Sequence, residues 1–579
     1  MPQRDAHVKL SGDDTATEGL PNGTQAPEPT SSCRHDFGVP SESSGSPIPV
    51  PVAICGMAMR LPGGISTEEQ LWDFLVNKGD ARDTIPADRY NVDGFFGGTK
   101  GKSNWSVPND ESKGGIPSSA GVPGMAYGYM LKDADLAHFD APLFSMTQKE
   151  LEWIDPQQRL LLEVTRECLE NAGEVNWRGK DIGCYIGSWG DDWLELMSRD
   201  TLDSHVYKIT GHADAMHSNR VSYEYDFKGP RTATESLLRQ GVLSPQASCR
   251  TFDAEADGYA RAEAVNMVYL KRLDDALRDK NPIRAVIRST ASNCDGKTAG
   301  ISHPSSESHE ALIRSCYLAG GIRDFTQTGF VECHGTGTRT GDPIETAAVA
   351  NVFGGKGVYI GSVKPNLGHS EGASGLTSLM KCILALEHKT IPPNIKFSKP
   401  NSDIPFEQAG LRVPIENTPW PEDRRERVSI NSFGIGGANA HVVLDSAESF
   451  GVGKHSRRGG PALRPRLLAF TANHVESVRK GASRYAQFLE ANPEAIDDVS
   501  YTLDTRREHL SHRAFAVADG ISSPEFSPPA RIPARAPEVI FVFTGQGAQW
   551  ATMGSQLVAD FPAVLGDLDI MDQALSGLG

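Results

Sequence analysis

Short apolar segments that alternate with helical ones constrain this chain more than any other feature of its sequence. Over residues 284–445, segments rich in β-branched and aromatic residues recur, and helical patterns lie between most of them. Strand alternating with helix is typical of mainly parallel or mixed sheets whose faces are covered by helices. We therefore predict an α/β fold. The predicted strands span residues 49–56, 182–187, 284–290, 330–333, 358–363, 428–433 and 539–543.

Two helices are predicted from their periodicity and end signals. Residues 149–173 carry apolar side chains at helical spacing, and Gly173 lies where a C-cap belongs. The apolar face comprises Leu161, Val164, Cys168 and Leu169. A second helix is predicted to begin with Asp342 as N-cap, Pro343 at N1 and Glu345 at N3.

The charge and length of the chain exclude several classes of protein. With 579 residues and 39% hydrophobic residues, the chain can form several domains with real cores. Its net charge of −17 argues against nucleic-acid binding, which needs a basic face. The first residues lack the apolar region of a signal peptide, and no apolar run is long enough for a bilayer. We expect a soluble, cytoplasmic protein without membrane contact.

The cysteines exclude one kind of metal site. There are nine of them, widely spaced, and none forms a C-x-x-C pair. That pattern excludes a zinc site built from paired cysteines and fits a reduced cytosol. We predict no bound metal.

Changes in composition divide the chain into four parts. Residues 1–48 are rich in Ser, Thr, Pro and Gly, and we expect them to be disordered. A large α/β domain is predicted over 49–445, followed by a linker region over 446–536 that contains a helical stretch at 475–505. Residues 537–579 begin a further unit, and some 40 residues cannot close a domain core.

Four motifs carry candidate chemistry. One has His334 at the end of a predicted strand, followed by a Gly/Thr loop. Another places Lys364 and His369 between a strand and a helix. The third is a glycine-rich reversal between two strands, and the fourth is an acidic, aromatic loop. In the order named, the motifs span residues 332–342, 361–372, 431–443 and 252–261.

Taken together, these four motifs resemble the β-ketoacyl synthase module of fungal type I iterative polyketide synthases. The likeness runs over about residues 50–444, and the segments 155–162 and 218–223 belong to it as well. The resemblance implies a thiolase-like fold, in which two similar halves form an αβαβα arrangement. It also implies partners: malonyl and acyl thioesters carried on the phosphopantetheine arm of an acyl carrier protein, and a second copy of the chain in a homodimer.

The resemblance assigns roles to four residues of this sequence. In the family, a cysteine at the N-terminus of a buried helix takes the acyl chain as a thioester, because the helix dipole lowers the pKa of its thiol. Decarboxylation of a malonyl unit gives an enolate that attacks this thioester. Two neutral imidazoles, by resemblance those of His334 and His369, stabilise the enolate oxygen. Lys364 is expected to support His369, and the backbone N–H of Phe433 to serve the oxyanion hole.

The segment that carries the nucleophile is missing from this sequence. In the family, a strand ending in Asp-Thr-Ala-Cys-Ser-Ser-Ser follows the stretch that matches Pro230, and a helix and another strand come next. Here only ten residues separate Pro230 from Gly241, where the likeness resumes. None of the nine cysteines has a replacement context. The implied fold is therefore incomplete, and we expect this chain to be inactive in condensation and to fold poorly.

A second family resemblance begins near the C-terminus. Residues 541–550, continuing to Gly554, are similar to the opening of a malonyl-CoA acyltransferase domain, in which the backbone of the residue matching Gln546 supports an oxyanion. The serine nucleophile and its histidine come later in that family. The resemblance thus predicts a truncated acyltransferase stub after a linker at 446–536. No carrier-protein segment is recognisable, so no phosphopantetheine or other cofactor is expected on this chain.

Several interpretations stay open at this point. The chain is a truncated, inactive polyketide synthase, or the sequence record has lost an exon of an active, highly reducing one. A third interpretation is a non-catalytic remnant that dimerises with an intact synthase. A residual decarboxylase using the two histidines is a weaker one. Residues 368–372 also match the G-x-S-x-G elbow of serine hydrolases, with Ser370 as nucleophile.

Overall fold

A computed structural model gives the fold of most of the chain. It describes residues 50–577 apart from 90–125, 133, 135, 191, 199–206, 236–242, 453–464, 519–524, 534 and 536–537. The tail predicted to be disordered, 1–48, and the junction at 236–242 lie outside the described residues.

One half of the large domain is a five-stranded mixed sheet in the order β9-β8-β13-β14-β7. The strands β9, β8 and β13 run parallel, and β14 is antiparallel to both of its neighbours. The bounds are β7 Ala285–Cys294, β8 Thr328–Glu332, β9 Val358–Gly361, β13 Arg425–Phe433 and β14 Ala438–Ser446, with β11 Leu411–Arg412 added beside β9.

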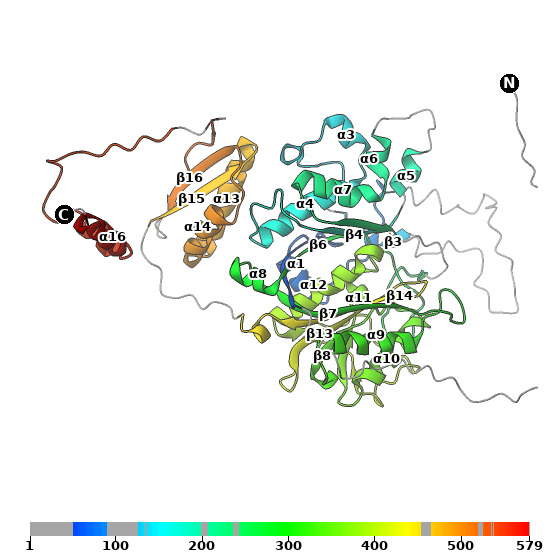
Figure 1. The fold of residues 1–579 in the computed structure, drawn as a ribbon. Helices are drawn as coiled ribbons and strands as arrows, with labels where there is room; N and C mark the ends of the chain where they lie inside the picture. The colour runs from blue at the N-terminus through cyan, green and yellow to red at the C-terminus, as the bar shows by residue number, and fades with distance from the viewer. Residues whose placement is uncertain are drawn as a thin grey trace, which may run out of the picture. The chain divides into compact units, whose positions relative to one another are not determined.

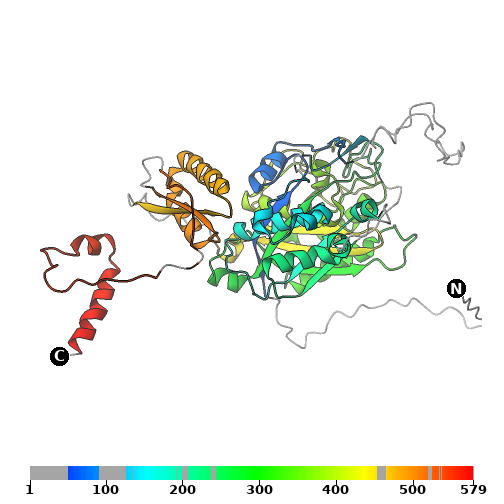
Figure 2. The ribbon, with the colours of Figure 1, turned by 90° about the horizontal axis from the view of Figure 1, so that it is seen from above.

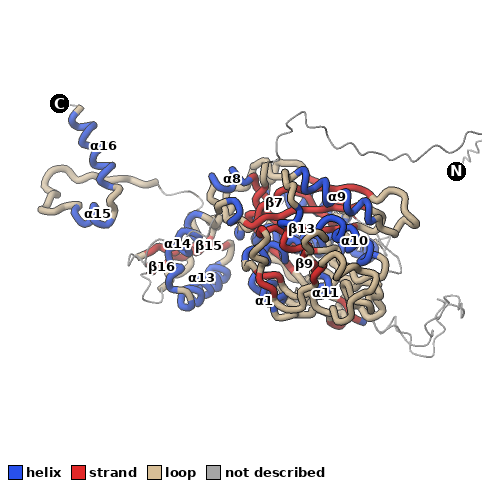
Figure 3. Tube along the Cα trace, turned by 90° about the horizontal axis from the view of Figure 1, so that it is seen from below, coloured by secondary structure: helices blue, strands red, loops and turns tan. Residues whose placement is uncertain are grey.

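Helices cover both faces of this sheet. In Figure 1, α12 lies above β7 and β13, whereas α9 and α10 lie below β7, and Figure 3 shows α9 and α10 next to each other beside β13. The bounds are α9 Ser306–Ala319, α10 Gly341–Phe353 and α12 Ser374–Glu387. Every residue of β8 is buried as a result.

The other half also consists of strands covered by helices, but its strands form two separate pairs. β1 pairs antiparallel with β6 and also with β7, which joins the two halves. β4 and β5 form a parallel sheet of their own. The helices α4 and α7 pack on these strands. The bounds are β1 Val52–Arg60, β4 Cys184–Ser188, β5 Arg231–Glu235, β6 Val265–Arg272, α4 Pro156–Asn171 and α7 Ala215–Tyr225.

The two halves follow one plan, and the N-terminal half is incomplete among the described residues. The pairs β5-β4 and β6-β1 correspond to β9-β8 and β14-β7, with the same strand directions. In the C-terminal half β13 joins the two pairs, but no described strand joins β4 to β6. The side chain of Tyr185, on β4, is accordingly 69% exposed. The alternating layers of helix and sheet in Figure 1 confirm the predicted α/β fold.

Two helix predictions need correction. Residues 149–173 form two helices, α3 Gln148–Trp153 and α4, because Pro156 disfavours a helical residue before it and Asp155 caps the second helix. Gly173 follows the helix with φ +59°, as its C-cap position predicts. Asp342 is not an N-cap: α10 begins at Gly341, and the carboxylate of Asp342 accepts hydrogen bonds from more distant backbone.

A smaller α/β unit follows the large domain. The predicted helical region is confirmed as α13 Val475–Ala491 and α14 Ile496–Thr505. Both helices pack on a three-stranded sheet that the sequence pattern did not predict (Figure 2). Its strands are β15 Arg466–Ala472, β16 His512–Ala518 and β17 Ala530–Arg531.

The predicted strand at 539–543 is wrong. These residues form no strand, and their apolar side chains are exposed. The helices after them, α15 Ser555–Asp560 and α16 Val564–Ser576, contain no buried residue that the structure describes. An apolar strand needs a partner, and none is present among the described residues.

The remaining elements are short. They are α1 Glu68–Val76, α5 Asp192–Met197, α6 Lys208–His212, α8 Leu273–Arg278, α11 Lys364–Leu367, β2 Asp83–Thr84, β3 Tyr127–Gly128, β10 Thr390–Ile391 and β12 Thr418–Pro419. None of the helices in the described part of the chain has both the length and the apolarity to cross a membrane. No group of three or more potential metal ligands occurs within the same residues.

Candidate functional site

His334 is held at the end of β8 by a buried carboxylate. The backbone N–H groups of His334 and Gly335 donate to the two oxygens of Glu345, at 2.7 and 2.9 Å. The Asn431 amide donates to the same carboxylate at 2.8 Å. Glu345 therefore fixes the turn that directs His334 into the site.

A second carboxylate shapes the loop that follows. Asp342 accepts hydrogen bonds from the backbone N–H of Phe252 at 2.8 Å and of Gly337 at 3.1 Å. Burial raises the pKa of Asp342 to about 7. Gly337 is required here, because its φ is +79° and a Cβ would lie 2.6 Å from the backbone of Arg250.

His369 follows a glycine that brings two segments together. Gly368 has φ +73°, and a Cβ there would meet the ring of Tyr129 at 2.6 Å. The backbone N–H of His369 donates to Ala260 at 2.8 Å. The backbone N–H of Glu371 donates to Nδ1 of His369 at 3.2 Å. Nδ1 is thus an acceptor, which leaves the proton of the neutral ring on Nε2.

The two histidines meet although 34 residues separate them in the sequence. Their ring centroids are 5.2 Å apart, and the rings are nearly perpendicular. Burial lowers the pKa of His334 and of His369 well below the ordinary value, and the nearby Lys364 lowers both further. Both rings are neutral at pH 7, so each carries one N–H donor. The pair can donate hydrogen bonds to an oxygen on which negative charge develops.

Lys364 lies fully buried beside this pair. Burial lowers its pKa, and the carboxylates of Glu332 and Glu345 oppose that shift. Glu332 itself pairs with Lys381 at 2.6 Å. Lys364 is thus part of a buried charge cluster and not a surface charge.

A cavity of about 510 Å³ connects these groups. The predicted residues His334, His369 and Phe433 line it, but Lys364 does not. Its wall also contains polar residues that were not predicted from sequence to be site residues. Among them are His309, Asp342, Glu345 and Glu371. In the sequence, Asp342 and Glu345 stand in a helix-capping pattern, and we interpreted them as capping residues and not as part of the site.

Ser370 has contacts that do not favour a hydrolase. Its hydroxyl is buried and lies 3.2 Å from the hydroxyl of Thr377. No hydrogen bond joins it to a histidine within the described part of the chain. A serine nucleophile needs a base in hydrogen-bond reach.

The described cysteines lack the features of a thiolate nucleophile. Seven of them are buried, and burial raises their thiol pKa values, to about 11 for Cys249 and well above the ordinary value for Cys333. The eighth, Cys294, is exposed on β7. Its two sequence neighbours, Asn293 and Asp295, both contact Asn439. Because successive side chains of a strand point to opposite faces, Cys294 points away from Asn439.

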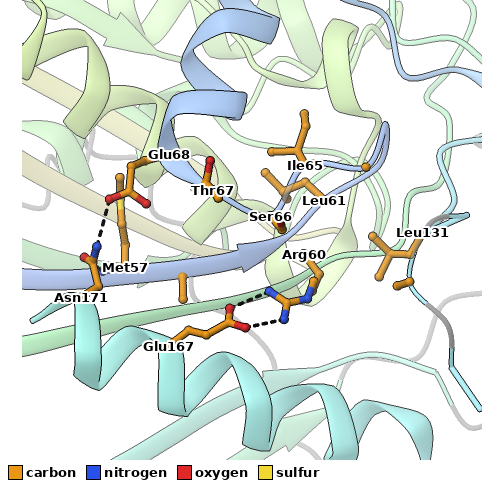
Figure 4. Close-up of a pocket in the computed structure, with 13 residues that line it drawn as sticks. Met57, Arg60, Leu61, Ile65, Ser66, Thr67, Glu68, Leu131, Glu167 and Asn171 are labelled. Carbon is orange, nitrogen blue, oxygen red and sulfur yellow. Dashed lines mark hydrogen bonds and ion pairs between the residues drawn. The ribbon is translucent and has the colours of Figure 1, made fainter. Parts of the chain in front are cut away.

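A second cavity, of about 450 Å³, lies between the end of β1 and α4 (Figure 4). Its charged side chains are already paired. Arg60 donates twice to Glu167, at 2.6 and 2.7 Å, and Asn171 donates to Glu68 at 2.9 Å. The first pair ties β1 to α4 and the second ties α4 to α1, so the charged groups of this cavity serve the packing of these elements.

Gln546 lies in an irregular stretch and is exposed. The role that the resemblance assigns to its backbone stays a prediction.

Family models match most of the chain. The N-terminal domain of β-ketoacyl synthases matches in three overlapping pieces, residues 50–113, 99–237 and 231–276. The C-terminal domain of the same enzymes matches residues 284–398, and the ketoacyl-synthetase C-terminal extension matches 400–517.

Two similar proteins are fungal polyketide synthases. A highly reducing polyketide synthase of a Fusarium species is 55% identical over 91% of this chain, and one of Glarea lozoyensis is 44% identical over 91%. The chain spans 22% and 25% of the length of these two relatives. The second alignment runs over 644 residues, more than the 579 of this chain, so the relative has residues without a counterpart here.

A solved structure has the same fold. The ketosynthase from module 6 of the bacillaene synthase of Bacillus subtilis superposes with a TM-score of 0.67 and 29% identity. The match covers 81% of this chain and 83% of that one. The thiolase-like ketosynthase fold is thereby established for the large domain.

Proposed function

This chain belongs to the β-ketoacyl synthase family, and we propose that it is the condensing portion of a highly reducing polyketide synthase that lacks its own nucleophile. The substrates are malonyl and acyl groups in thioester linkage to the phosphopantetheine arm of an acyl carrier protein. The proposed catalytic residues are His334 and His369, with Lys364 and Phe433 in support.

The histidine pair supports the enolate step. When the malonyl carboxylate leaves as CO2, the bonding electrons move into the thioester carbonyl and its oxygen becomes negative. The Nε2–H of His369 faces this oxygen as a donor, because Nδ1 accepts the hydrogen bond of Glu371. His334 completes the pair from 5.2 Å, measured between ring centroids. Neutral donors in a buried site stabilise such an anion strongly.

The incomplete N-terminal half is the observation that carries the proposal of a missing nucleophile. Strand β13 and helix α12 of the C-terminal half have no counterparts among the described residues of the other half. In the family the nucleophile begins a helix that follows a strand in this region. The proposal also requires that relatives have residues without a counterpart here, and the alignment with the Glarea relative runs over more residues than this chain contains.

The test restores the segment. Residues of the Fusarium relative that align between Pro230 and Gly241 are inserted there, and release of a ketide product from malonyl and acyl carrier thioesters is measured. The restored chain is expected to form product, and the present chain is not. A restored chain with His369→Ala should be inactive. Product from the present chain, or none from a folded restored chain, contradicts the proposal.

Two alternatives to a protein without its nucleophile have their own tests. If an exon was lost from the sequence record, the transcript will encode further residues between Lys228 and Pro245, and sequencing it decides this. If the chain is a remnant that pairs with an intact synthase in a dimer, it will co-purify with one. The oxyanion role of the Gln546 backbone in an acyltransferase domain belongs to the same proposal.

A further inference from the structure

Besides His334 and His369, the cavity is lined by a buried histidine on α9 to which no family motif in the sequence points. His309 is on α9, is 1% exposed, and lines the cavity together with His334 and His369. Its ring stacks on that of Phe433, with centroids 3.8 Å apart and an interplanar angle of 18°. Phe433 in turn lies 6.4 Å from His334. The rings of His309, Phe433 and His334 therefore lie in a row, and His334 at its end belongs to the histidine pair.

The ring nitrogens of His309 are poorly satisfied. Both are buried, and neither Nδ1 nor Nε2 forms a hydrogen bond of ordinary geometry with a residue that the structure describes, although the Asn439 side chain is near enough to raise the pKa of the ring. The nearest carboxylate oxygen, of Asp295, is 3.8 Å from Nε2, which is too long for a hydrogen bond. The same oxygen already accepts the amide of Asn439 at 2.7 Å.

The ring is neutral and has one donor and one acceptor to offer. Burial lowers the pKa of His309 to about 4, although Asp295 and Asn439 oppose the shift. The flat face of the ring is taken by Phe433, so its edge is the part that can meet a ligand. Buried polar groups are normally hydrogen-bonded, and a neutral imidazole suits a neutral carbonyl or amide better than a carboxylate.

We propose that His309 is a ligand-contacting residue that hydrogen-bonds a neutral carbonyl or amide group of the pantetheine-linked acyl ligand. The inference rests on the proposed function, since that function supplies the ligand. The carbonyl comes either from the pantetheine arm or from the acyl group. Stacking on Phe433 fixes the orientation of the His309 ring. The hydrogen bond therefore favours ligands whose carbonyl or amide group lies next to this ring when they occupy the cavity.

The chain offers a matched control. His212, on α6, is also buried, at 4% exposure, and both of its ring nitrogens also lack hydrogen-bond partners among the described residues. It does not line the cavity. Replacing either histidine with phenylalanine removes two ring nitrogens and keeps an aromatic ring, and at position 309 that ring can still stack on Phe433.

The experiment measures binding of malonyl-pantetheine amide, in which nitrogen replaces the thioester sulfur, by titration calorimetry. His309→Phe is expected to weaken binding by roughly 3- to 10-fold, the loss of one hydrogen bond, and His212→Phe to leave it within about twofold. Pantetheine alone is titrated in parallel. If His309→Phe weakens that binding too, the contact is to the arm; if only the acylated probe is affected, it is to the acyl carbonyl.

A second measurement does not depend on variants. In the chain labelled with ¹⁵N-histidine, the ring nitrogen shifts of His309 are expected to move when the probe is added, and those of His212 are not. Equal binding by wild type and His309→Phe, or unmoved His309 shifts at saturation, overturns the proposal and leaves the proposed function standing. If neither this chain nor the restored one binds the probe, both the proposed role of His309 and the proposed function are contradicted.

Discussion

At the residue scale, buried carboxylates do as much to form the site as the histidines themselves. Glu345 accepts three hydrogen bonds and fixes the turn at His334, and Asp342 holds the loop after it. The family motifs identified His334 and His369, which come together from distant segments. Glu345 and Asp342 were misinterpreted, because a capping signature and a loop-bracing carboxylate look the same in sequence. His309 could not be found, because its contact with Phe433 depends on how α9 packs.

Removing the charge of Glu345 tests its role. Glu345→Gln replaces an acceptor oxygen with an amide donor that faces backbone N–H groups. We expect a loss of about 2–4 kcal/mol in the free energy of unfolding, since at least one buried donor is left unpaired. Denaturant unfolding measures it. The exposed Glu407→Gln serves as control and should change stability by less than about 0.5 kcal/mol. A similar small effect for both would contradict this role.

The pH dependence of stability tests the burial of His309. Burial lowers the pKa of His309 in the folded chain to about 4, from an ordinary value of 6.5. As the pH falls, the imidazole of residue 309 is protonated at a higher pH in the unfolded chain than in the folded one. The stability contributed by the neutral ring is therefore fully present above pH 6.5 and is lost as the pH falls towards 4. Between pH 7 and pH 4, the free energy of unfolding of His309→Phe is expected to fall by up to about 3 kcal/mol less than that of the wild-type chain. Parallel stability curves for the two proteins between pH 7 and 4.5 would refute the burial argument.

At the element scale, strands and helices with strong local signals were predicted, and those that depend on partners were not. The strands around the histidines are confirmed within a few residues of their predicted ends. The helix predicted at 149–173 is divided at Pro156, where local geometry overrides the apolar periodicity. The apolar segment 539–543 forms no strand, because it has no partner to pair with among the described residues.

Tyr185 tests the missing layer of the N-terminal half. It is 69% exposed on β4, whereas every residue of the corresponding β8 is buried. We expect Tyr185→Ser to change the stability of this chain by less than about 0.5 kcal/mol. In the restored chain the same change should cost about 2–4 kcal/mol, because the inserted helix covers the ring. Equal effects in both chains would show that the restored segment does not pack on this face.

At the scale of the whole molecule, the two halves share one plan, and among the described residues only the C-terminal half has all of its strands. The C-terminal half supplies the histidines, the lysine and the glycine-rich hairpin. The N-terminal half supplies the scaffold on which the family places its nucleophile. The fold class could be predicted from the sequence because the motifs lie at their family separations. The gap in the sheet could be located in space only from the strand order.

The strand and helix that we propose to be absent also predict low stability. Their loss would remove about six large apolar side chains from the core, which amounts to about 9–18 kcal/mol in total at roughly 1.5–3 kcal/mol each. That sum reaches the whole stability of a typical domain, about 5–15 kcal/mol. We expect this chain to melt broadly or at low temperature by circular dichroism, and the restored chain to melt cooperatively. A sharp transition of the present chain above about 50 °C would count against this expectation.

The central claim is that the chain keeps an enolate-stabilising histidine pair without a thiol to carry the acyl group. Intact-protein mass spectrometry after incubation with a labelled acyl thioester tests it most directly. The account predicts no covalent acyl adduct on this chain and one adduct on the restored chain, at the inserted cysteine. A stoichiometric adduct on any cysteine of the present chain, followed by transfer to a malonyl-derived enolate, would contradict it.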